Sequence, residues 1–170
     1  MSEIYYFCRE MCCKRFLQST TSAPKAVQTQ MLNIKNDNLM TKQRIEIEHE
    51  LKSTSANIVW KLISTADGYA NWLADSVTAD GDELTFTWGQ EWRHHEQRKA
   101  HFVAKERLCR VRFHWDDDPE DVFVEIRMER CSLSGTYSLF ITDFSDEDDT
   151  DWLYSTWEKN LKRLHETSGV

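Results

Sequence analysis

Residues 150–167, TDWLYSTWEKNLKRLHET, are the stretch from which the fold can be inferred. Apolar residues recur in it at i, i+4, i+8 and i+11, which is the spacing of one stripe along an α-helix. The stripe consists of Leu153, Trp157, Leu161 and Leu164. The acidic run 146–149 precedes the stretch and basic residues lie in its second half, an arrangement that the helix macrodipole favours. A helix of about 18 residues is roughly 27 Å long, so this stripe requires a large surface to pack against.

The segments upstream supply such a surface, because many of them alternate apolar and polar residues with the period of a β-strand. The first alternating segment, 44–51, is followed by Ser53-Thr54-Ser55, whose hydroxyl groups are candidates for a helix N-cap. A helix is expected next, and a second short helical segment is expected over 69–73. The first helix is predicted to carry on one side Ile58, Val59, Leu62 and Ile63.

After Ala74 the period changes from 3.6 to two, and the segments between strands are short. The alternating segments are 84–88, 92–104, 109–115, 122–128 and 137–141, with turns predicted at 79–82 and 132–135. Short turns between consecutive strands imply an antiparallel sheet with one face that must be covered. The predicted fold is therefore α+β: a curved antiparallel β-sheet wrapped around a long C-terminal helix, a helix-grip fold, with two short helices after the first strand.

The first 39 residues differ from the rest of the chain. They show no sustained periodicity, contain none of the seven Trp, and have a Thr/Ser/Pro/Gln-rich middle. The apolar run 4–8 is too short for a signal peptide and is followed at once by charged residues. Residues 1–39 are predicted to be a disordered N-terminal extension, or to lie upstream of a natural start at Met40. The helix-grip domain is predicted to span residues 41–167.

The charge of the chain excludes several classes of partner. Residues 1–39 hold five Lys/Arg and three Asp/Glu, whereas residues 40–170 hold 16 and 26, so the predicted domain is strongly acidic. An acidic surface repels phosphate groups, which disfavours nucleic acid and anionic membrane surfaces. No apolar run approaches the ~18–20 residues of a membrane span. The five cysteines are odd in number and show no disulfide or metal-binding spacing, which favours reduced thiols in a cytoplasmic protein.

The order of elements and several motifs resemble a known family. The motifs are VWKLIST (59–65) with Gly68, WLAD (72–75), LTFTW (84–88), VRFHW (111–115), LFITDF (139–144) and WEKNLKRL (157–164). Over about Thr41 to Glu166 the chain resembles the START-like branch of the Bet v 1/SRPBCC superfamily. It is similar in particular to small bacterial START-like proteins related to the Hsp90-ATPase-activator-homologue group.

The resemblance implies a cavity between the sheet and the long helix, which in the superfamily takes lipids, sterols, polyketides or other apolar molecules. It implies no catalytic residues. The residues predicted to line such a cavity are Trp72, Phe86, Trp88, Phe113, Trp115, Ile126, Leu139, Trp157 and Leu161. Large rings at these positions line a pocket or fill the space completely, and the residue types alone favour a filled core only slightly.

Other chemistry is weakly indicated. His94 and Glu96, with His101 or His114 from a neighbouring strand, form the nearest approach to a metal site, but a polar strand face explains them better. The acidic runs 116–121 and 146–151 lack the spacing of a calcium loop and are expected to be a solvated loop and a helix start. No catalytic constellation or phosphate-binding motif is visible. No metal and no cofactor is predicted, and an enzyme is disfavoured.

Two functions remain. The first is a non-enzymatic binding module that holds a small hydrophobic ligand between the sheet and the C-terminal helix. The alternative is a protein-interaction module, chaperone-associated in the manner of the Hsp90-ATPase-activator group, with a filled core. The number of bulky inward residues discriminates between them. The sequence defines neither the ligand, nor the pathway, nor the oligomeric state.

Overall fold

The computed structural model describes residues 42–89 and 95–170. Within them a strand is followed by two short helices, six strands and a C-terminal helix. The elements are β1 (Gln43–Glu50), α1 (Ala56–Ser64), α2 (Ala66–Ala70), β2 (Ser76–Asp80), β3 (Glu83–Gly89), β4 (His95–Glu106), β5 (Arg110–Trp115), β6 (Val124–Arg130), β7 (Tyr137–Ser145), the 3₁₀ turn η1 (Glu147–Asp149) and α3 (Thr150–Ser168). The predicted fold class is confirmed.

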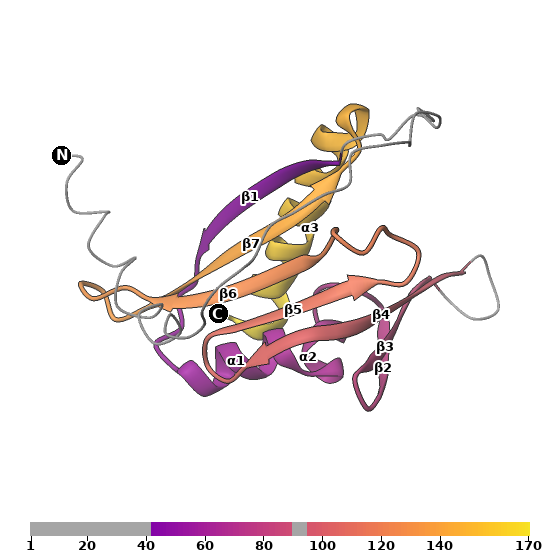
Figure 1. Ribbon diagram of the computed structural model, residues 1–170. Helices are drawn as coiled ribbons and strands as arrows, with labels where there is room; N and C mark the ends of the chain where they lie inside the picture. The colour runs from indigo at the N-terminus through magenta and orange to yellow at the C-terminus, as the bar shows by residue number, and fades with distance from the viewer. Residues whose placement is uncertain (1–41, 90–94) are drawn as a thin grey trace, which may run out of the picture. The chain divides into compact units, whose positions relative to one another are not determined.

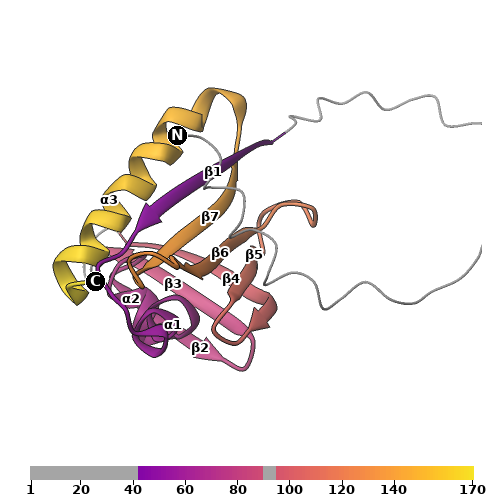
Figure 2. The ribbon, with the colours of Figure 1, turned by 90° about the vertical axis from the view of Figure 1, so that its left-hand side faces the viewer.

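The strands form one antiparallel sheet in the order β1-β7-β6-β5-β4-β3-β2. Strands β2 to β7 are a meander, and β1 is an edge strand that pairs with β7. In this pairing Ile45 lies opposite Asp143. Figures 1 and 2 show α3 running along one face of this curved sheet, with α1 and α2 packed at one end of it. We call the face toward α3 the inner face and the opposite one the outer face.

Local sequence explains most element boundaries. Alternation places Leu84 and Phe86 of β3, and Val111 and Phe113 of β5, on the buried inner face. Helix α3 ends where Gly169 adopts a left-handed conformation, with φ of 70°, and donates its N–H to the carbonyl of His165. The predicted helix 150–167 is thus correct to within one residue at its end.

Three local predictions need correction. Ile58 is 51% exposed, whereas the apolar residues on the buried side of α1 are Val59, Leu62 and Ile63. Ser55 occupies the N-cap of α1 but its side chain makes no capping hydrogen bond. The predicted turn 79–82 is shorter than expected, because β2 continues to Asp80 and only Gly81 and Asp82 form the connection to β3.

The junction of α1 and α2 depends on Gly68. A Cβ atom built on this glycine would lie 2.2 Å from the carbonyl oxygen of Lys61. The backbones of the two helices approach too closely there for any side chain. The same approach brings Trp72 under α1, where its indole N–H donates to the carbonyl of Leu62 at 3.1 Å.

Candidate functional site

All nine residues predicted to line a cavity lie between the sheet and the helices. Seven of them are buried, while Trp88 and Trp115 are half-buried at the edge of the core. They come from the α2–β2 connection (Trp72), β3 (Phe86, Trp88), β5 (Phe113, Trp115), β6 (Ile126), β7 (Leu139) and α3 (Trp157, Leu161). Their inward orientation follows the alternation in the sequence, and their role in ligand binding stays a prediction.

The rings among them pack directly on one another. The centroid of the Phe86 ring lies 5.0 Å from that of Trp115, 5.7 Å from Phe113 and 6.0 Å from Trp88. Trp72 and Trp157 form a second contact, with centroids 6.1 Å apart. Such separations are those of aromatic pairs in contact. The rings therefore occupy much of the space in which an apolar ligand would have to lie.

Tyr69 was not among the residues predicted from the sequence to line a cavity, although it lies at the centre of this cluster. Its ring centroid is 5.7 Å from Phe86 and 5.9 Å from Phe113, and its side chain is fully buried. Within the described residues its hydroxyl group has no hydrogen-bond partner, and burial raises the pKa of Tyr69 far above its usual range. The residue follows Gly68 in a helix of only five residues, too short for a periodic signal.

Asp143 is a second residue that the sequence did not single out. Its carboxyl group is buried on the inner face of β7, where Oδ1 accepts the backbone N–H of Phe144 at 2.7 Å. Oδ2 accepts the indole N–H of Trp157 from α3 at 2.8 Å. Burial raises the pKa of Asp143 to about 6, although both hydrogen bonds favour the ionised form. The core between β7 and α3 therefore contains one titratable polar group.

One cavity formed by the described residues lies on the outer face. It is an open cleft of about 720 Å³ formed by the outward residues of β4 and β5 and by the loop between β5 and β6. We call it the acidic cleft, and its lining residues are His101, Val103, Arg112, His114, Asp116, Asp118, Glu120, Asp121 and Phe123. Of these, His101, Arg112 and His114 point outward because they alternate with inward-facing residues of β4 and β5. Val103 lies where the β4–β5 register shifts, and the other five residues belong to the loop.

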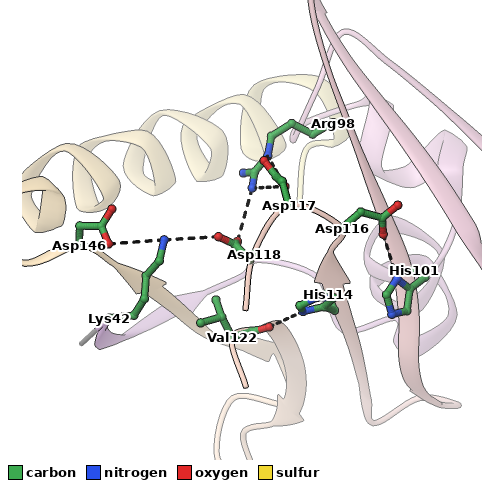
Figure 3. Close-up of polar contacts among 9 residues, drawn as sticks. All are labelled: Lys42, Arg98, His101, His114, Asp116, Asp117, Asp118, Val122 and Asp146. Carbon is green, nitrogen blue, oxygen red and sulfur yellow. Dashed lines mark hydrogen bonds and ion pairs between the residues drawn. The ribbon is translucent and has the colours of Figure 1, made fainter. Parts of the chain in front are cut away.

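The loop that carries the acidic residues is held in place from several sides (Figure 3). The guanidinium group of Arg98 makes a bidentate pair with Asp117, with Nη2 2.7 Å from Oδ1 and Nε 3.1 Å from Oδ2. Lys42 Nζ lies between Asp118 and Asp146, 3.4 Å from the first carboxylate and 3.6 Å from the second. The acidic run is thus a solvent-facing loop, as predicted, but one with defined anchors.

Two histidines on the outer face contact the same loop. His101 Nδ1 lies 3.0 Å from Asp116 Oδ1, and His114 Nδ1 lies 2.7 Å from the carbonyl oxygen of Val122 (Figure 3). The two imidazole rings meet edge to face, with centroids 5.2 Å apart. Since the carbonyl of Val122 can only accept, Nδ1 of His114 must carry the proton.

A metal site is not found within the described residues, where no three His, Cys, Asp or Glu side chains converge on one point. His94, the first residue of the hypothetical metal site, lies outside the described residues. His101 and His114 do lie on neighbouring strands, opposite one another in the β4–β5 register. The Nδ1 atom of each lies within hydrogen-bond distance of the loop.

The family of the chain follows from a comparison of sequences. A model of the START-like superfamily domain matches residues 39–170. The chain belongs to the START-like superfamily. The resemblance seen in the sequence is thereby confirmed. A Bacteroides fragilis protein of known solution structure is 41% identical, with a TM-score of 0.53 over 75% of this chain and 92% of that one. No curated protein matches the chain.

Two more distant structures share the fold. An AHSA1-like protein from Aeromonas hydrophila is 19% identical, with a TM-score of 0.59 over 75% of this chain and 94% of its own. An Aha1 dimer from Colwellia psychrerythraea is 15% identical, with a TM-score of 0.57 over 72% and 92%. In general terms, the family and fold support a binding module. No helix in the described part of the chain has the length and apolarity needed to cross a bilayer.

Proposed function

We propose that this START-like domain is a protein-interaction module whose interior is filled by its own aromatic side chains. The observation that carries the proposal is the direct packing of Phe86 against Trp88, Phe113 and Trp115 in the core between the sheet and the helices. With its interior occupied in this way, the domain has its outer surface available for recognition.

The energetic argument supports the same choice. An apolar cavity in a protein core costs about 24 cal/mol per Å³, and ligand pockets begin near roughly 300 Å³. Separating the rings to that extent would cost roughly 7 kcal/mol before the ligand makes any contact. A protein partner that binds to the surface avoids this cost.

The test compares bound partners with bound small molecules. The full chain is purified from its own host under mild conditions and measured by native mass spectrometry, with and without denaturation. We expect the bare mass of the chain, together with a stoichiometric complex when a candidate partner from affinity capture is purified and added back. A reproducible excess mass of a few hundred daltons, lost on denaturation, would overturn the filled interior.

A second function, binding of a small hydrophobic ligand, is favoured by a different observation. Trp88 and Trp115 are only half-buried, their centroids lie 6.2 Å apart, and Leu153 of α3 beside the core is also half-buried. A ligand could enter at this end, with the nine predicted residues as its lining and Asp143 as a polar group below it. Trp157→Ala should then weaken binding of any ligand identified by mass spectrometry, and an unchanged affinity would argue against this placement.

A further inference from the structure

We infer that the acidic cleft binds a basic segment of a partner protein, an extended peptide that carries Lys and Arg side chains. This inference rests on the proposed function and names the surface and the chemistry of the partner. It follows from the charge of the cleft, from the apolar residues in its wall, from one hydrogen-bond acceptor in its floor, and from the anchoring of its loop.

The charge of the cleft is negative and only partly neutralised. Four carboxylates line it, whereas its one lining arginine, Arg112, is already paired with Glu125 at 2.8 Å. Asp118 is paired with Lys42 and Arg98, and Asp116 is within hydrogen-bond distance of His101 Nδ1. In the described part of the structure Glu120 and Asp121 are exposed and have no ion pair. They are placed to receive cations from a partner.

The wall of the cleft is apolar where a basic side chain would place its aliphatic stem. Val103 is 56% exposed on β4, at the point where the β4–β5 register shifts between Phe102 and Ala104. The ring of Phe123 lies on the other side, with the guanidinium of Arg112 stacked 3.9 Å from its centroid. Lysine and arginine bury such stems on apolar surface while their charged ends reach carboxylates. A small inorganic cation would gain nothing from the apolar side chains of Val103 and Phe123.

His114 supplies an acceptor in the floor of the cleft. The residue is only 8% exposed and lines the cavity, and its protonated Nδ1 donates to the carbonyl of Val122. In the neutral ring Nε2 is therefore an acceptor, and no residue that the structure describes donates a hydrogen bond to it. A guanidinium or ammonium N–H of the partner would satisfy this nitrogen.

The anchors of the loop make this surface ready to bind. Besides the pairs of Arg98 and Lys42, backbone hydrogen bonds join Asp116 N–H to the carbonyl of Lys99 and Val122 N–H to that of Pro119. The carboxylates are therefore held on a fixed frame before the partner arrives. A preorganised surface loses less conformational entropy on binding.

The test uses a fluorescein-labelled peptide, Gly-Lys-Val-Arg-Lys-Val-Lys-Arg-Gly, and a matched peptide in which every Lys and Arg is Gln. Binding to the full chain is measured by fluorescence anisotropy at two salt concentrations, and amide chemical shifts locate the site. The variant Glu120→Gln/Asp121→Asn is compared with Glu158→Gln/Glu166→Gln, which makes the same charge change on exposed residues of α3.

We expect binding of the basic peptide that weakens with salt, shifts confined to the cleft residues, and about tenfold weaker binding by the cleft variant than by the α3 variant. Equal binding of the two peptides, or equal loss in the two variants, would overturn the inference. The proposed function is judged separately. If the cleft variant still forms the complex with the natural partner, the cleft is not the docking surface although the domain does bind protein.

Discussion

The buried carboxyl group of Asp143 makes a quantitative prediction about pH. Its side chain is 8% exposed, and burial raises its pKa from 3.8 to about 6 in the folded protein. In the unfolded chain the group is solvated, so the ordinary value applies there. One pKa unit corresponds to about 1.4 kcal/mol, so the rise corresponds to roughly 3 kcal/mol.

The sign follows from proton binding. Below pH 4 both the folded and the unfolded protein hold the proton on Asp143, and the carboxyl group contributes no cost. Between about pH 4 and pH 6 only the folded protein still binds it, so the free energy of unfolding falls as the pH rises. Well above pH 6 both states are ionised and the loss is complete, because the carboxylate is then buried and no described Lys or Arg forms an ion pair with it.

The variant Asp143→Asn isolates this contribution, since the amide does not titrate. The free energy of unfolding is measured by urea titration with Trp fluorescence for both proteins at pH 4, 5, 6 and 7. Other carboxylates, such as Asp117, whose pKa the pairing with Arg98 lowers, affect both proteins equally and cancel in the difference. We expect the wild-type minus variant difference to fall by about 3 kcal/mol from pH 4 to pH 7. A difference that stays constant over this range would refute the reasoning.

Three further substitutions test the packing of the interior, each by urea unfolding. Gly68→Ala should lower the free energy of unfolding by about 3 kcal/mol or more, because the new Cβ would lie 2.2 Å from the carbonyl oxygen of Lys61. A free energy of unfolding within about 1 kcal/mol of wild type would show that the α1–α2 junction relaxes easily. Phe86→Ala should lower the free energy of unfolding by about 3–5 kcal/mol, because it opens a cavity inside the ring cluster. A much smaller loss would mean that the neighbouring rings do not need Phe86 for their packing. Tyr69→Phe should be neutral or stabilise the fold by about 1 kcal/mol, since it removes a buried hydroxyl without a partner, whereas a clear loss would reveal a hydrogen bond to that group.

The fold could be predicted because its signals are local. Alternation in 84–88 and 111–115 places the correct residues on the inner face, and the spacing of Trp157, Leu161 and Leu164 identifies the buried side of α3. These patterns depend only on the geometry of one strand or one helix. The residues proposed as a lining are buried or packed against the core, because apolar residues at inward positions are buried whether or not a ligand lies beside them. Their role as a lining stays a prediction.

The polar features could not be predicted in this way, because they depend on contacts between distant segments. Asp143 is the only acidic residue within the motif 139–144, and its burial results from the packing of Trp157 across it. The acidic run 116–121 looked like an ordinary solvated loop. Its anchors come from Arg98, about twenty positions earlier, and from Lys42 at the start of the domain, separated from Asp118 by 76 positions. No periodicity in the chain encodes such pairs.

Arg98 connects the aromatic cluster of the core with the acidic cleft. Its guanidinium carbon lies 4.4 Å from the centre of the Trp115 ring, while its nitrogens hold Asp117 and Asp118. Trp115 itself is fixed edge to face against Phe86 and is followed directly by the loop that forms the cleft. The position of the loop is therefore set by the aromatic packing beneath it. A large cavity beneath Trp115 would remove the ring packing that holds it and would leave the loop of the cleft less well positioned. The proposed filled interior is therefore consistent with a surface that recognises a partner.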